Sequence, residues 1–281
     1  MTTPQTVTMT IPMTDWRSRF GFHTAPFTRE IPVAQRFPLP FFDEVLTALF
    51  RTVDQRNSAA LIAPSGTGKT ALLRALVDLL PETRYRVHYV KVTDLSRRDL
   101  CREIAAVCGA QPAGSYPVLV RRLQECFLAT MTDDAVRPVL LLDEAHDLRP
   151  NVFGLIRILT NFEMDARLVL SVILAGQTPL REMLRHPANE NVARRLSHVA
   201  TLRPLSRPES HRYIGHRCTI AGATTIPFDP GSLEAVYEVA CGNLRATDQL
   251  AAKALEVASD NGAAIVDASH IAQARRLIPG S

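Results

Sequence analysis

The chain has 281 residues, of which 46% are hydrophobic and 21% are charged, a balance that is typical of globular proteins and excludes a disordered chain. At this length about 70–75% of the surface of the unfolded chain can be buried, so the fold needs neither disulfides nor a structural metal. The net charge of +4 argues neither for nor against a nucleic-acid partner.

No segment has the features of a targeting sequence or a membrane span. The first basic residue is Arg17, so the N-terminus lacks the order of a signal peptide. The longest apolar uncharged stretch, 168–180, is shorter than the ~20 residues that a spanning helix needs. The five cysteines form no CxxC pair, which is typical of reduced thiols. We therefore expect a cytoplasmic protein without a membrane segment.

Strand-like and helix-like segments alternate through the first two thirds of the chain. Residues 1–40 show no clean period and predict an N-terminal arm or linker. A helix is then expected at 42–55. The apolar runs predict strands at 59–63, 85–92, 138–143, 168–175 and 198–202, with helices between them at 71–80, 97–108, 118–131 and 151–161. This alternation predicts an α/β core at 41–204, a parallel sheet covered by helices on both faces.

The last part of the chain predicts helices only. Ser206 and Glu209 have the spacing of a capping box, and Asp229 followed by Pro230 marks another helix start. Helical periodicity continues at 244–259 and 268–277. We expect a small all-helical lid domain at 205–281.

A glycine-rich segment lies between the first predicted strand and the next helix. It reads Ala63, Pro64, Ser65, Gly66, Thr67, Gly68, Lys69 and Thr70. The two glycines let several backbone N–H groups face one anion, and the helix adds its positive end. Lys69 supplies a charge for the β- and γ-phosphates, and the Thr70 hydroxyl is a ligand for Mg²⁺. This segment predicts a binding loop for ATP and Mg²⁺.

Acidic and polar residues follow the third and fourth predicted strands. Asp143 is placed to hold Mg²⁺ through water, and Glu144 to orient and deprotonate the attacking water. His146 is expected to be a polar surface or hinge residue. Gln177 follows the next strand, where ligands bind in parallel sheets. It is predicted to sense the γ-phosphate or the water, with a helix-capping turn as the alternative.

Arginines occur in two further segments from which a guanidinium group can bind phosphate. Arg194 and Arg195 lie just before the last predicted strand, where an arginine can enter the nucleotide site of a neighbouring subunit; the alternative is a solvated helix end. Arg245 begins a helix of the predicted lid and can reach back to the phosphates; its alternative is a surface arginine. Eight arginines against three glutamates between 181 and 217 favour a subunit contact around phosphate.

In this order the motifs resemble those of AAA+ ATPases, most of all the ExeA/GspA-like branch and the transposition ATPases of the TniB, TnsC and MuB type. The residues that carry the resemblance are 20–22, 26–27, 63–70, 143–146, 174–177, 202–206 and 242–245. The resemblance implies Gln177 as first sensor, Arg194 or Arg195 as arginine finger and Arg245 as second sensor. It also implies a homo-oligomer, ring or filament, with nucleotide between subunits.

Two functions follow from this resemblance. The first is an ATP-dependent regulator of DNA transposition, which assembles on duplex DNA and recruits or activates a transposase, with hydrolysis controlling disassembly. The second is a cytoplasmic ExeA/GspA-like ATPase for secretion or pilus assembly, acting with a membrane partner. A helicase- or loader-like motor is a weaker third. Secretion-type members carry a membrane helix and a cell-wall-binding region after the ATPase, and these 281 residues contain neither, so we favour the first.

Four residues are candidates for DNA contact. Lys91 and Thr93 end the second predicted strand, and Arg97 and Arg98 open the following helix, where N–H groups and positive charge suit phosphate. The alternative is a solvated helix start. Because no base-reading module is apparent, we expect binding without sequence specificity.

Overall fold

The computed structural model describes residues 16–28, 30–132 and 135–279, and it divides the chain into two compact units. The first 15 residues of the predicted arm lie outside the described residues. The α/β unit consists of Ile31–Leu205 and Asn243–Arg245, and the helical unit of Met1–Glu30, Ser206–Gly242 and Ala246–Ser281.

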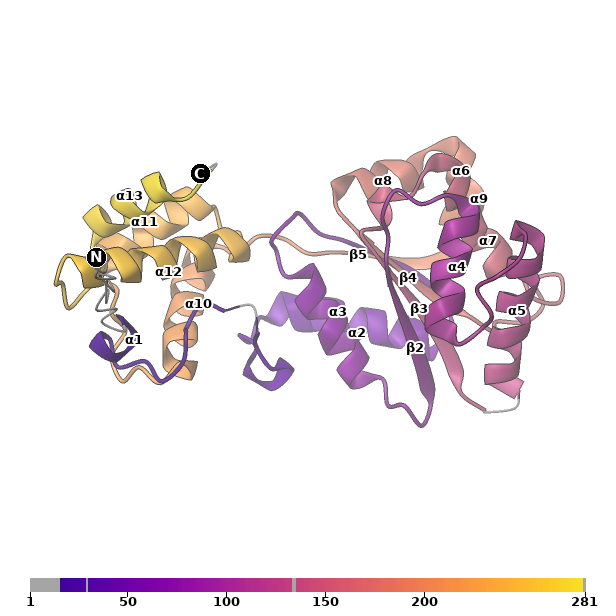
Figure 1. Ribbon diagram of the computed structural model, residues 1–281, viewed down its shortest axis with the longest axis horizontal. Helices are drawn as coiled ribbons and strands as arrows, with labels where there is room; N and C mark the ends of the chain where they lie inside the picture. Colours follow the sequence, from indigo (N-terminus) through magenta and orange to yellow (C-terminus); the bar gives the residue numbers. More distant parts are fainter. Residues whose placement is uncertain (1–15, 29, 133–134, 280–281) are drawn as a thin grey trace, which may run out of the picture. The chain divides into compact units, whose positions relative to one another are not determined.

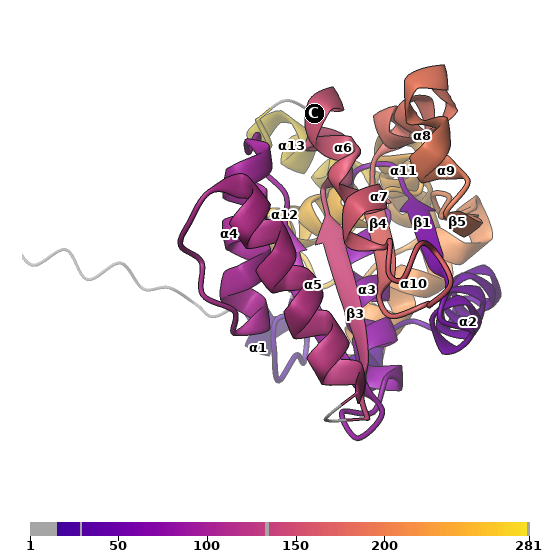
Figure 2. The same cartoon turned by 90° about the vertical axis from the view of Figure 1, so that its right-hand side faces the viewer.

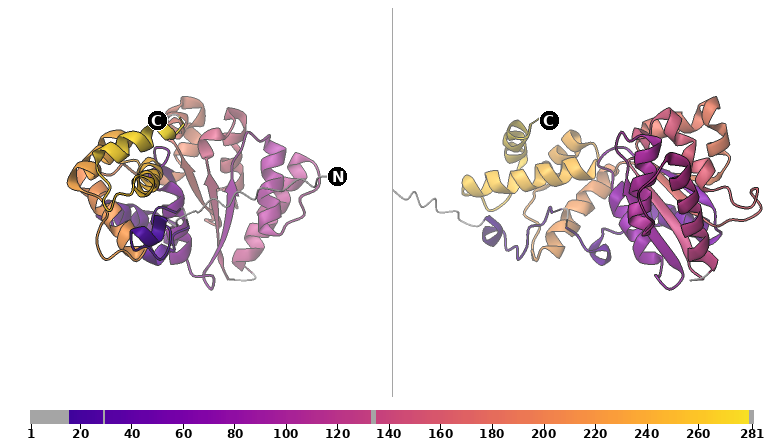
Figure 3. Two further views of the ribbon diagram at one scale, coloured as in Figure 1. Left: turned by 60° about the vertical axis from the view of Figure 1, so that its left-hand side comes forward. Right: turned by 45° about the vertical axis from the view of Figure 1, so that its right-hand side comes forward.

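The α/β unit contains a five-stranded sheet with the order β2-β3-β4-β1-β5, in which each neighbouring pair is parallel. Figure 3 (left) shows the strands running in one direction. Their bounds are β1 Ser58–Ile62, β2 Tyr85–Lys91, β3 Arg137–Asp143, β4 Ser171–Gly176 and β5 Leu196–Thr201. The predicted fold class, an α/β core with a parallel sheet flanked by helices, is confirmed.

The central strands are buried on both faces, whereas the two edge strands alternate between buried and exposed positions. Central strands of a parallel sheet are buried in this way because helices cover both faces of the sheet. The fourth strand is shorter than predicted. Its pairing with β3 begins at Ser171 opposite Val139, and Leu168, which the apolar run had included, is 52% exposed.

Helices cover both faces of the sheet. On one face α4 and α5 pack together against β2 and β3, and α2, which contacts α3, packs against β1 and β5 on the opposite face (Figure 2). The bounds in this unit are α2 Pro40–Asp54, α3 Lys69–Leu79, α4 Arg97–Cys108, α5 Tyr116–Thr132, α6 Pro150–Phe153, α7 Leu155–Leu159, α8 Thr178–Arg185 and α9 Glu190–Ala193, with short 3-10 helices η1 Val33–Gln35, η2 Ala145–Asp147 and η3 Pro187–Asn189. The single helix predicted at 151–161 is wrong, since the chain forms α6 and α7 with a break at Gly154.

The helical unit, whose helices are labelled in Figure 1, has its own core of buried hydrophobic residues. Its helices are α1 Trp16–Arg19, α10 Arg207–Ile220, α11 Pro230–Ala240, α12 Leu244–Asp260 and α13 Ala268–Leu277. Leu244 and Arg245, the first two residues of α12, are counted with the α/β unit. The predicted capping box of α10 is present, since Ser206 and Glu209 cap each other. Phe20 and Phe22 from the N-terminal part of the chain are buried in this core. Among the described residues, no helix combines the length and the apolar character that crossing a membrane requires.

Candidate nucleotide-binding site

The loop between β1 and α3 has a backbone that only glycine adopts without strain. Gly66 and Gly68 have φ angles of 77° and 96°, in the left-handed region that a Cβ disfavours. The Thr67 hydroxyl donates a hydrogen bond of 2.8 Å to the Pro64 carbonyl and closes the turn. The loop therefore ends at the N-terminus of an 11-residue helix, whose free N–H groups suit an anion.

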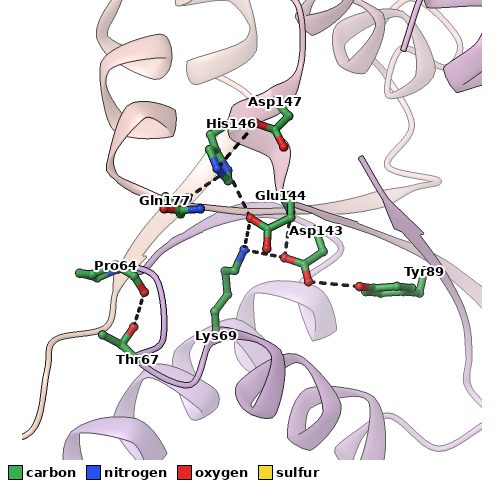
Figure 4. Close-up of polar contacts among 9 residues, drawn as sticks. All are labelled: Pro64, Thr67, Lys69, Tyr89, Asp143, Glu144, His146, Asp147 and Gln177. Atoms are coloured by element: carbon green, nitrogen blue, oxygen red, sulfur yellow. Dashed lines mark hydrogen bonds and ion pairs between the residues drawn. The ribbon is translucent and has the colours of Figure 1, made fainter. Parts of the chain in front are cut away.

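Lys69 is the first residue of α3, and its ammonium group is buried. Its Nζ lies 2.8 Å from Asp143 Oδ1 and 2.8 Å from Glu144 Oε2 (Figure 4). The three side chains come from the loop helix and from the end of β3, and together they carry one net negative charge. A cation beside a curled glycine loop fits a phosphate, and two carboxylates fit a divalent ion.

The end of β3 turns sharply at Glu144, which has φ 55° and ψ 35°. Left-handed backbone in a residue other than glycine costs roughly 1–3 kcal/mol and is found mostly at functional sites. The Glu144 N–H donates a 2.8 Å hydrogen bond to Asp143 Oδ1, which stabilises the turn. As a result both carboxylates face Lys69.

The residues present fit Mg²⁺ bound together with a nucleotide. Thr70 lies exposed in the first turn of α3, and Asp143 offers a carboxylate at the neighbouring strand end. The described residues hold no group of three His, Cys, Asp or Glu side chains arranged to bind a metal. Magnesium is usually held by one or two protein oxygens plus phosphates and waters, and this sparse donor set is of that kind.

His146 is half-buried, with 12% of its side chain exposed, so it is not a surface residue as expected; the other expected role, a hinge, stays a prediction. Its Nδ1 accepts a hydrogen bond of 3.3 Å from the Gln177 N–H and lies 3.5 Å from Glu144 Oε2. A Cβ added to Gly176 would lie 3.2 Å from the His146 N atom, so a glycine is needed for this approach. Gln177 is the N-cap residue directly before α8 Thr178–Arg185, and its side chain makes no capping hydrogen bond.

Tyr89 also belongs to the site, although no sequence motif indicates it. Its hydroxyl donates a 3.1 Å hydrogen bond to Asp143 Oδ2 (Figure 4). Partial burial, together with the charges of Asp143 and Glu144, raises the pKa of Tyr89 to about 12, so the hydroxyl stays protonated well above neutral pH. The pairing of β2 with β3 brings it there, with Lys91 opposite Asp143.

Arg245 meets the glycine-rich loop through its backbone. Its N–H donates a 3.2 Å hydrogen bond to the Gly66 carbonyl, and Asn243 Nδ2 donates one of 2.6 Å to the Ser65 carbonyl. Both belong to the α/β unit, and the Arg245 residue is exposed. Its second-sensor role stays a prediction.

Arg194 and Arg195, the two predicted finger residues, follow α9 and bond to acids outside the loop. Arg194 pairs with Glu190 at 2.6 Å and Arg195 with Asp165 at 2.8 Å. The structure therefore does not bring them to Lys69 within one chain, which is the arrangement expected of a residue that acts on a neighbouring subunit.

The four DNA candidates are all exposed. Lys91 ends β2, and Thr93 follows it before α4. Arg97 Nε donates to the Asn151 carbonyl, and Arg98 Nε donates a 3.1 Å hydrogen bond to the Gly114 carbonyl. The structure places these residues on one connection, between the end of β2 and the first turn of α4.

Three comparisons relate the chain to known proteins. Residues 51–184 match the family model described as "AAA domain". The chain is 33% identical over 203 residues to the General secretion pathway protein A of Aeromonas hydrophila, and the match covers 70% of this chain and 36% of that protein. The chain thus spans about a third of the length of this relative.

Solved structures resemble the chain over most of its length. Cdc6p from Pyrobaculum aerophilum has a TM-score of 0.72 at 18% identity, covering 90% of this chain and 70% of that one. The ORC1 protein of Aeropyrum pernix, solved in complex with DNA, has a TM-score of 0.67 at 19% identity, covering 90% and 68%. At these identities the likeness shows the fold alone.

Proposed function

We propose that this chain, which has the P-loop AAA+ fold with an AAA domain at residues 51–184, binds ATP and hydrolyses it to ADP and phosphate. The observation that carries this proposal is the position of Lys69 Nζ, 2.8 Å from Asp143 and 2.8 Å from Glu144. This proximity supports Lys69 as the phosphate-binding lysine, Asp143 as the carboxylate for Mg²⁺ and Glu144 as the base.

Each of these residues has a separate role. The loop N–H groups and Lys69 bind the β- and γ-phosphates, while Thr70 and Asp143 hold Mg²⁺. When bound, Mg²⁺ supplies positive charge that offsets the charge on the phosphate oxygens in the transition state. The γ-phosphate competes with Glu144 for the Lys69 ammonium. Glu144, once released, accepts the proton of the attacking water.

Three further side chains complete the proposed site. Gln177, at the tip of β4, senses the γ-phosphate or orients the water. Arg245 is the second sensor, and Arg194 or Arg195 reaches the site of a neighbouring subunit in a homo-oligomer. Guanidinium groups suit this role because they stay charged and bind phosphate oxygens in pairs.

We further propose that hydrolysis regulates DNA transposition, by controlling assembly of the chain on duplex DNA and its recruitment of a transposase. Two observations support a DNA role. Lys91, Arg97 and Arg98 are exposed on one connection of the α/β unit, and a protein of the same fold was solved bound to DNA. Contacts to phosphate from these residues would not read sequence.

A second candidate function is favoured by a different observation. The General secretion pathway protein A of Aeromonas hydrophila is 33% identical to this chain over 203 residues. On this alternative the same ATPase site drives secretion or pilus assembly together with a membrane partner. Both candidates require ATP hydrolysis and differ in what the assembled chain binds.

Replacing the proposed base tests the ATPase directly. In Glu144→Gln, ATP affinity should stay near that of the wild type while turnover falls on the order of a hundredfold or more. Glu125→Gln is the matched control, because Glu125 is an exposed residue of α5 that pairs with Arg121. Affinity is measured with a fluorescent ATP analogue and turnover by phosphate release. Undiminished hydrolysis by Glu144→Gln would refute the role of Glu144.

The same variant separates the two candidate functions. With ATP, Glu144→Gln should form assemblies on duplex DNA of any sequence, seen by negative stain, and the affinity should fall steeply with salt. Arg98→Ala should lower the logarithmic salt slope by about 1, whereas Arg121→Ala should not. Absence of ATP-dependent DNA binding would reject the transposition role and favour the secretion one.

A further inference from the structure

The Asp143 carboxylate is held on both of its oxygens. Oδ1 accepts the Glu144 N–H at 2.8 Å and lies 2.8 Å from Lys69 Nζ. Oδ2 accepts the Tyr89 hydroxyl at 3.1 Å. Asp143 is buried, so these contacts, rather than bulk water, determine the plane in which its oxygens lie.

The two sides of this carboxylate respond differently when phosphate binds. Lys69 has to turn toward the β- and γ-phosphates, and its contact with Oδ1 then weakens. The Tyr89 hydroxyl comes from another strand, β2, and has no role in binding phosphate. On the proposed ATPase function, we expect its bond to Oδ2 to remain when nucleotide binds, together with the backbone bond to Oδ1.

The position of Tyr89 follows from the parallel register of the two strands. Tyr89 is paired with Leu141, and Lys91 with Asp143. The Tyr89 side chain points from β2 toward Asp143, the last residue of β3 (Figure 4). Tyr89 remains 44% exposed, so its hydroxyl is not needed to fill a core, and the bond to Asp143 is what it contributes.

We propose that Tyr89 is a positioning residue for Mg²⁺, which fixes the orientation of the Asp143 carboxylate and thereby sets the affinity of the site for the metal. This inference rests on the proposed ATPase function. Groups that hydrogen-bond to the residues around a metal typically change metal affinity by about 10–100-fold. Because a single hydroxyl is involved, we expect the lower end, about tenfold.

Tyr89→Phe tests this inference by removing only the hydroxyl. The strand offers a matched control in Tyr85, whose hydroxyl donates a 2.6 Å hydrogen bond to Asp54 at the other end of β2. Binding of a fluorescent ATP analogue is titrated with Mg²⁺ and repeated in EDTA. Tyr89→Phe should raise the half-saturating Mg²⁺ concentration about tenfold without changing affinity in EDTA, and Tyr85→Phe should change neither.

The results distinguish the inference from the function on which it rests. A wild-type chain without Mg²⁺-dependent nucleotide binding refutes the proposed ATPase. Normal binding in the wild type with an unchanged Mg²⁺ requirement in Tyr89→Phe, or an equal change in Tyr85→Phe, overturns the role of Tyr89 alone. Tyr89→His retains a ring with an N–H donor, and partial recovery of Mg²⁺ affinity in it supports the hydrogen bond. Melting temperatures of all variants are measured to check that each one folds. If Tyr89→Phe does not fold, Tyr89→Leu replaces it, and a lower Mg²⁺ affinity in folded Tyr89→Leu supports the role of Tyr89.

Discussion

Arg194 and Arg195 are neighbours in the chain, but their guanidinium groups have different surroundings. The Arg194 side chain is 75% exposed and pairs with Glu190 one turn earlier. The Arg195 side chain is 22% exposed, and its Nη2 contacts both oxygens of Asp165 at 2.8 Å. Asp165 is one of three consecutive left-handed residues, so Arg195 stabilises a strained turn. Arg194 is therefore the better candidate for the finger.

We expect Arg194→Ala to keep ATP binding and to lose turnover by roughly a thousandfold in the assembled protein. A finger acting between subunits allows complementation. In an equal mixture of Arg194→Ala and Glu144→Gln, roughly a quarter of the interfaces pair an intact Arg194 with an intact Glu144. The mixture should recover about that share of wild-type phosphate release.

Arg195→Ala is the matched comparison in the same mixing experiment. It should lower the free energy of unfolding by about 0.2–1 kcal/mol, as expected for a partly exposed ion pair, and should retain turnover. If instead Arg195→Ala alone loses turnover, regains it when mixed with Glu144→Gln, and Arg194→Ala stays active, the finger is Arg195. Failure of both mixtures would argue against a finger at this helix end.

At the scale of helices and strands, the sequence predicts the features that depend on the spacing of residues close together in the chain. The glycine-rich loop is one continuous segment, and Asp143 and Glu144 are adjacent in the chain. Each motif can therefore be recognised from the sequence alone, and together they identify the lysine and both carboxylates. The start of β4 could not be located, because residues 168–170 are as apolar as the strand itself. Tyr89 could not be found either, since its contact with Asp143 depends on how β2 and β3 pair, and that pairing is set by packing.

The helical unit also contains a contact between residues that lie far apart in the sequence. Arg217 on α10 is 1% exposed, and it donates hydrogen bonds of 2.7 Å to the carbonyls of Pro26 and Thr28. It also donates to the Tyr213 hydroxyl, which in turn donates to Asp248. A buried guanidinium thus fastens the N-terminal segment to α10, about 190 residues away.

Removing this guanidinium should destabilise the helical unit strongly. We expect Arg217→Ala to lower the free energy of unfolding by about 3–5 kcal/mol, because it leaves buried acceptors without a donor. Arg212→Ala, on the exposed side of the same helix, should stay within about 0.5 kcal/mol. Urea unfolding measures both, and trypsin should cut at Arg17 or Arg19 faster in Arg217→Ala. Equal stability of the two variants would contradict the fastening role.

At the scale of the whole molecule, the two units have separate cores. One core joins the sheet of the α/β unit to its helices, and the other consists of residues from the N-terminal segment and α10 to α13. The glycine-rich loop, Lys69 and the acids all lie in the α/β unit. A ligand stabilises the part of a protein that binds it. Nucleotide should therefore stabilise the α/β unit against unfolding and leave the stability of the helical unit unchanged.

This arrangement predicts two unfolding transitions, of which ATP raises only one. Trp16, the one tryptophan of the sequence, packs against Phe22 in the helical unit and reports on that unit, whereas far-UV circular dichroism follows both. Mg²⁺ and ATP at 100 times the dissociation constant should stabilise the α/β unit by about 2.7 kcal/mol and leave the Trp16 transition in place. Lys69→Ala is the control that should abolish the shift. An equal shift of the Trp16 transition would mean that the two units unfold together.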